Sequence, residues 1–78
     1  MYYLGIDFHK AYSVLHLTDS KGLLVKKQKL FNRKQLFQQF LKDIQPICAV
    51  VEACRNWPVM VELLDDLVDH IKLAIPLK

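Results

Sequence analysis

Tyr2-Tyr3-Leu4-Gly5-Ile6-Asp7 is the stretch that decides the fold, because it is an apolar run that ends in a carboxylate. Its alternation places residues 2, 4 and 6 on one face of a β-strand and residues 3 and 5 on the other. Strands with two apolar faces are typical of the centre of an α/β sheet. We therefore expect Asp7 to end a buried strand, where an unpaired charge is costly and needs a partner.

A second stretch repeats this pattern. Ile47-Cys48-Ala49-Val50-Val51-Glu52 is also apolar and also ends in an acid. Two buried strands that each end in an acid indicate two carboxylates at one edge of a sheet.

Alternation and turn residues predict the remaining strands. Residues 12–18 alternate as a strand, and Asp19-Ser20-Lys21-Gly22 is a hairpin turn signal in which glycine supplies a positive φ. Residues 23–31 follow as a third strand that is basic on its outer side, as suits an edge. Residues 70–75 predict a last strand, which Pro76 ends.

Two helices are predicted from apolar residues at helical spacing. The first has Asn32 as N-cap, with Gln35 completing a capping box, and its apolar stripe runs to Ile44 before Pro46 ends it. Asn56 is expected to cap the second helix, and proline is tolerated in its first turn.

The element order βββαβαβ predicts a mixed α/β sheet. Because crossovers between parallel strands are right-handed, the expected strand order is 3-2-1-4-5. The first and fourth strands are then parallel neighbours, so Asp7 and Glu52 meet at the edge where open α/β sheets place their sites. Both helices cover one face. We interpret residues 1–78 as an incomplete domain whose other face is covered by a second copy or by a C-terminal continuation.

Length and composition limit the class of protein. Seventy-eight residues, 53% of them hydrophobic, make one small domain. The longest uncharged apolar run, residues 44–51, is too short to span a bilayer, and the first residues lack the pattern of a signal peptide. We therefore expect a cytoplasmic protein without a membrane segment. Cys48 and Cys54 are interpreted as reduced thiols.

Charge is unevenly distributed along the chain, although the net charge is only +3. Seven basic residues and no acid lie between Ser20 and Lys42, whereas four acids and no base lie between Glu62 and Asp69. One interpretation is two solvated faces of opposite sign. The other is a patch that follows the phosphates of a nucleic acid. Its residues would be Lys26, Lys27, Lys29, Arg33 and Lys34.

Gly5-Ile6-Asp7-Phe8-His9-Lys10, a basic hairpin and then Val51-Glu52-Ala53 resemble the amino-terminal domain of the DEDD insertion-sequence transposases. The catalytic domain of these proteins is similar to the RuvC resolvase and has a ribonuclease-H-like fold. The resemblance covers about residues 3–76. It implies a DNA transposase or recombinase that cleaves and rejoins DNA strands, and relatives also use a guide RNA.

The same resemblance implies a site of four acids that binds two divalent ions, Mg²⁺ or Mn²⁺. Asp7 and Glu52 would be the first two acids, and the other two lie beyond Pro76 in the family. Two-metal cleavage needs carboxylates that bridge ions about 4 Å apart. Lys10 either contacts a DNA phosphate or neutralises Asp7. We expect this incomplete set of acids to be inactive by itself.

Two other functions remain open. One is an inactive transposase remnant that folds and self-associates, which is suggested by Cys54-Arg55 in place of the Thr-Gly that usually follows Glu-Ala in the family. An actin-like or sugar-kinase fragment that binds ATP has the same order of elements and a similar Gly-Ile-Asp opening. Its phosphate-binding glycine loop is missing after Asp7.

Several polar residues also have structural interpretations. Asp7 would cap a turn, and Glu52 would pair with Arg55 or Lys10. We expect His9 to lie at the surface, His16 to have a structural role and Trp57 to be a packing residue. Three further acids are expected outside the site, at the sheet edge opposite Asp7: Asp65, Asp66 and Asp69.

Overall fold

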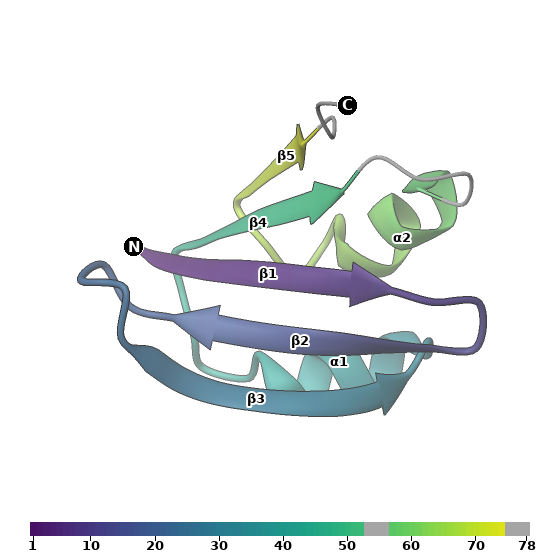
Figure 1. Cartoon of the computed structure of the whole chain (residues 1–78), viewed down its shortest axis with the longest axis horizontal. Helices are drawn as coiled ribbons and strands as arrows, with labels where there is room; N and C mark the ends of the chain where they lie inside the picture. Colours follow the sequence, from purple (N-terminus) through teal and green to yellow (C-terminus); the bar gives the residue numbers. More distant parts are fainter. Residues whose placement is uncertain (53–56, 75–78) are drawn as a thin grey trace.

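The computed structural model describes residues 1–52 and 57–74, without the side chains of Glu52 and Trp57. Within these ranges a five-stranded sheet forms one layer and two helices form the other (Figure 1). The order βββαβαβ is confirmed. The elements are β1 (Tyr2–Phe8), β2 (Tyr12–Thr18), β3 (Leu24–Phe31), α1 (Lys34–Phe40), β4 (Ile47–Glu52), α2 (Trp57–Leu64) and β5 (His70–Ala74).

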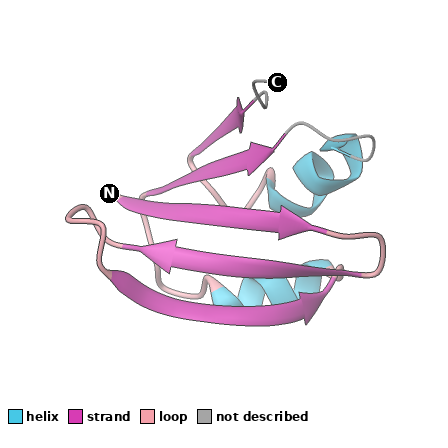
Figure 2. Ribbon diagram, viewed as in Figure 1, coloured by secondary structure: helices cyan, strands magenta, loops and turns pink. Residues whose placement is uncertain are grey.

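The sheet has the predicted strand order, β3-β2-β1-β4-β5. β1 lies at its centre, antiparallel to β2 and parallel to β4, and β4 is parallel to β5. Figure 2 shows that both helices lie on the same side of the sheet, as the two right-handed crossovers require. No helix of the described part is long and apolar enough to cross a membrane.

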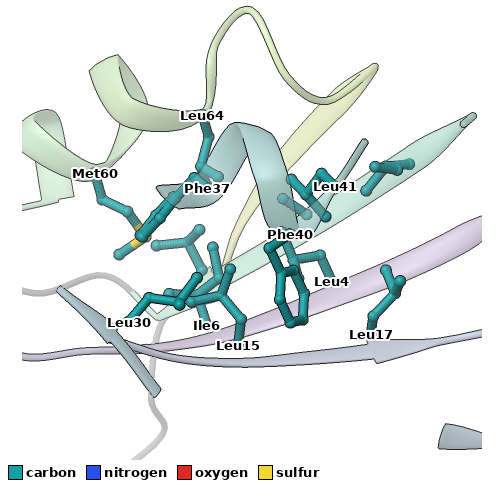
Figure 3. Packing of buried hydrophobic residues seen from close by; sticks show 13 residues of the cluster. Leu4, Ile6, Leu15, Leu17, Leu30, Phe37, Phe40, Leu41, Met60 and Leu64 are labelled. Carbon is teal, nitrogen blue, oxygen red and sulfur yellow. The ribbon is translucent and has the colours of Figure 1, made fainter. Parts of the chain in front are cut away.

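The hydrophobic core fills the space between the helices and one face of the sheet (Figure 3). Alternation along β1 buries Leu4 and Ile6 on this face, which we call the helix face. The helices contribute large apolar side chains that point toward the sheet. The core residues from the helices and the loop after α1 are Phe37, Phe40, Leu41, Met60 and Leu64.

The opposite face of the sheet, which we call the open face, has no helix of the described residues against it (Figure 1). Asp7 alternates with the buried Ile6 and lies on this face, where its side chain is 65% exposed. The expectation of a desolvated acid at the end of β1 is therefore wrong. Tyr3 and Val50 make part of the open face apolar, as expected, and each is about two-fifths exposed (43% and 39%).

The start of α1 differs from the prediction. Arg33 occupies the N-cap position without a side-chain hydrogen bond, and the first helical residue is Lys34. The side chain of Asn32 turns away from the helix and binds the connection between β1 and β2. The helix also ends at Phe40, before the predicted Ile44, because the chain enters a turn in which Asp43 has a φ of 62°.

The limits of the strands agree with the prediction within one residue, whereas α2 ends at Leu64, before the last residue of its predicted apolar stripe, Leu67. β3 begins at Leu24, one residue late, while α2 carries Pro58 in its first turn as expected. Cys48 is a buried free thiol, as predicted. The predicted features at Cys54, Arg55, Asn56, Ile75 and Pro76 lie outside the described residues.

The two glycines provide a matched test of the backbone. Gly22 has a φ of 83° and open space around an added Cβ, so Gly22→Ala meets only backbone strain, which we expect to cost about 1–2 kcal/mol. At Gly5 an added Cβ would lie 3.9 Å from the Cβ of His16, an ordinary contact. Gly5→Ala should therefore stabilise the strand by about 0.5 kcal/mol. Urea denaturation of both variants measures the difference, and equal effects would contradict this account of the hairpin turn.

Candidate functional site

The carboxyl ends of β1 and β4 meet at one edge of the sheet (Figure 1). The parallel register runs from Tyr2 opposite Ile47 to Ile6 opposite Val51, and Asp7 and Glu52 are the next residues of the two strands. Neighbouring strands lie about 4.8 Å apart. The structure thus brings the backbones of the two predicted acids together.

Asp7 takes part in a chain of contacts on the open face. Its Oδ2 lies 3.1 Å from Nε2 of His9. The His9 ring stacks on Tyr12, with 4.6 Å between the ring centroids and 22° between the planes. The Nζ of Lys29 lies 4.1 Å from the centroid of the same tyrosine ring. A carboxylate, an imidazole, an aromatic ring and a cation therefore lie in sequence across this edge.

The connection between β1 and β2 is held by a polar network centred on Asn32. Its Nδ2 donates to the carbonyl oxygens of His9, at 2.7 Å, and Lys10, at 3.3 Å. Its Oδ1 accepts a 2.6 Å hydrogen bond from the hydroxyl of Ser13, which is fully buried. The His9 amide also donates to the Tyr12 carbonyl at 2.9 Å. These bonds fix the backbone that carries His9 next to Asp7.

The predicted basic residues are divided between two sides of the sheet. Lys27 and Lys29 alternate onto the open face, where Lys29 joins the contacts around Tyr12. Lys26 lies on the helix face, with its Nζ 4.5 Å from the centroid of the Phe40 ring. Lys34 is at the start of α1 and forms an ion pair of 2.6 Å with Asp66. One continuous basic patch is therefore not formed.

The remaining two basic residues of the prediction flank the site. Lys10 is exposed in the connection that follows β1, and Arg33 is exposed before α1. The described contact of Asp7 is with His9, and not with Lys10. Neutralisation of Asp7 by Lys10 is thus not the arrangement found.

Among the later acids, Asp69 lies at the edge of the sheet opposite Asp7, as expected. Asp69 Oδ2 accepts a 2.7 Å hydrogen bond from the amide of Ile47, at the amino end of β4 and hence at the opposite edge of the sheet. Asp66 pairs with Lys34 in the helix layer. Asp65 is exposed after α2. None of the three lies beside Asp7.

No protein-family model, curated protein or solved structure matches the chain. Among the described side chains, no group of three or more His, Cys, Asp or Glu is arranged to hold a metal ion. The side chain of Glu52 is not among those described, so the edge formed with Asp7 is defined by one described carboxylate and the backbone of its neighbour.

Sequence reasoning missed the contact between His9 and Asp7. The available signal was their spacing, since residues i and i+2 of an extended chain point to the same side. His9 is exposed, as expected for a surface histidine, yet its ring is held against both Asp7 and Tyr12. His16 is half-buried on the open face opposite Gly5, a position that fits a structural role.

Proposed function

We propose that the chain is the amino-terminal part of a ribonuclease-H-like catalytic domain of a DEDD transposase, which cleaves and rejoins DNA strands with divalent metal ions. One observation supports the proposal: the neighbouring parallel strands β1 and β4 each carry an acid at or next to the carboxyl end, and Asp7 and Glu52 directly follow the paired residues Ile6 and Val51. The resemblance of the residues around these two acids to the transposase family supports it.

The chemistry of the two acids fits Mg²⁺ or Mn²⁺. Both ions prefer oxygen ligands, and the Asp7 carboxylate is open to solvent, so it is accessible to a hydrated ion. When bound, the ions would activate the attacking oxygen and stabilise the leaving oxygen. In the proposal Asp7 and Glu52 orient the ions, and two further acids come from outside this sequence.

DNA is the proposed partner of the open face. Lys27 and Lys29 lie on this face, and Lys29 reaches the Tyr12 ring close to His9 and Asp7. Cations beside a carboxylate edge supply contacts to phosphates, which dominate the affinity for DNA. A second copy or a C-terminal continuation would cover the apolar part of the face around Tyr3 and Val50. A guide RNA remains an expectation from the family alone.

No observation favours the ATP-binding alternative. The connection between β1 and β2 contains no glycine, and the stacked rings of His9 and Tyr12 lie where a phosphate loop would be needed. The second alternative is an inactive transposase remnant. It would differ from an active transposase in whether Asp7 and Glu52 still bind metal, so metal binding is the property to measure.

Titration of the chain with Mg²⁺ and with Mn²⁺, followed by NMR or calorimetry, tests the proposal. An incomplete set of acids should bind with a dissociation constant on the order of millimolar, and Asp7→Asn should weaken binding by at least about tenfold. Asp65→Asn is the matched control, because this aspartate is also exposed but lies after α2. Binding that is equal in wild type and Asp7→Asn would overturn the site.

A further inference from the structure

The contact between Asp7 and His9 has a geometry that suits a shared metal ion. We propose that His9 is a second metal ligand beside Asp7, and that its nitrogen makes this edge of the sheet prefer a transition-metal ion, with Zn²⁺ as the probe, over Mg²⁺. The inference rests on the proposed function in one respect, which is that Asp7 is a metal ligand.

The first argument is the distance between the two donor atoms. Oδ2 of Asp7 and Nε2 of His9 are 3.1 Å apart. Zn²⁺ binds nitrogen and carboxylate oxygen at about 2.0–2.2 Å, so two ligands at a right angle are about 3.0 Å apart and two tetrahedral ligands about 3.4 Å apart. The observed separation lies between these values. The distance between the two donor atoms therefore suits one ion bound to both of them.

The second argument is that His9 is held in place and that both ligands are accessible. The His9 ring stacks on Tyr12, and its backbone is bonded to the carbonyl of Tyr12 and to the side chain of Asn32. The side chains of His9 and Asp7 are 44% and 65% exposed, so an ion reaches them from solvent and keeps waters in its other positions. Little side-chain freedom is lost when the ion binds, which favours affinity.

The third argument concerns selectivity. Imidazole suits Zn²⁺ and the other late first-row ions, whereas Mg²⁺ prefers oxygen ligands and gives up its waters reluctantly. The affinity of Zn²⁺ should therefore depend on His9 much more than the affinity of Mg²⁺ does. His9 is then a residue that determines metal specificity: its Nε2, in the neutral imidazole that carries its proton on Nδ1, would exchange the contact with Asp7 Oδ2 for a bond to the ion.

Zn²⁺ titration of the 78-residue chain, read at the imidazole nitrogens by long-range ¹H–¹⁵N NMR, tests the inference. The Nε2 signal of His9 is expected to move to the position of a metal-bound nitrogen. In His9→Gln the affinity for Zn²⁺ at this edge should fall by at least about tenfold, with less than about a twofold change for Mg²⁺. His70→Gln, an exposed histidine at the start of β5, should change neither.

His9→Asp separates a ligand from a structural contact. An aspartate at this position restores an oxygen donor, so Mg²⁺ affinity should rise above the wild-type value while Zn²⁺ affinity falls. Unchanged Zn²⁺ affinity in both His9 variants would overturn the inference. If the Zn²⁺ affinity is unchanged in both His9 variants but Asp7→Asn abolishes Mg²⁺ binding, the proposed function stands and only the role of His9 as a metal ligand is refuted. If Asp7→Asn also leaves the binding of both metals unchanged, the proposed function and the role of His9 are both refuted.

Discussion

Phe37→Ala is expected to unfold a large part of the protein at room temperature. Phe37 is fully buried in α1, and Figure 3 shows its ring close to Met60 and Leu64 of α2, above the sheet. Truncating a buried phenylalanine costs about 3–5 kcal/mol, because the apolar contacts are lost and a cavity remains. Domains of this length have a free energy of unfolding of about 4–12 kcal/mol. The loss is therefore comparable to the lower part of that range.

The result follows from the two-layer architecture. The helices cover only one face of the sheet, so the core between the layers supplies most of the hydrophobic stabilisation. Phe37 lies where α1 meets α2, and removing its ring loosens both helices from the strands. A larger domain with a second core would lose a smaller share of its stability to the same substitution.

Urea denaturation followed by circular dichroism measures this loss. Phe31→Ala is the matched control, because Phe31 is 65% exposed at the end of β3. Its substitution should change the free energy of unfolding by about 0.5 kcal/mol or less. If Phe31→Ala proved as costly as Phe37→Ala, the open face would be covered in solution and the helix face would not be the only core.

Much of the sheet could be predicted because its information is local or topological. Alternation of apolar residues identified β1 and β4, and the Asp19-to-Gly22 turn joined β2 to β3. The handedness of crossovers then fixed the strand order. The neighbouring positions of Asp7 and Glu52 followed from that order, before any side-chain geometry was known.

The errors concern properties that depend on distant parts of the chain. Two apolar faces on β1 predicted a buried Asp7, but exposure depends on whether a second layer covers the open face. The contact between Asp7 and His9 depends on the path of the chain after β1, which the hydrophobic pattern does not determine. The Asn32 capping box failed because a partner 19 residues away in sequence, Ser13, competes for the same side chain.

Asn32→Ala is accordingly expected to destabilise the protein by about 2 kcal/mol, more than the loss of an exposed helix cap. The substitution removes the hydrogen bonds to the carbonyls of His9 and Lys10, and it leaves the buried Ser13 hydroxyl without its acceptor. Chemical denaturation measures the effect. Gln35→Ala is the control that separates the predicted capping box from the observed hydrogen bonds of Asn32. If Asn32 and Gln35 formed a capping box, Gln35→Ala would destabilise the protein about as much as Asn32→Ala. Because Gln35 is exposed on α1, we expect Gln35→Ala to cost less than about 0.5 kcal/mol.

A double-mutant cycle with Ser13 locates the loss. Ser13→Ala in the Asn32→Ala background removes the unsatisfied hydroxyl, so the double variant should be more stable than Asn32→Ala alone by about 1 kcal/mol. Additive losses would mean that the two side chains do not interact in solution. Because Asn32 also holds the carbonyl of His9, its removal should broaden the His9 ring signals and weaken Zn²⁺ binding at Asp7, while Gln35→Ala leaves both unchanged. The connection between β1 and β2 is thus expected to link the stability of the fold to the geometry of the candidate site.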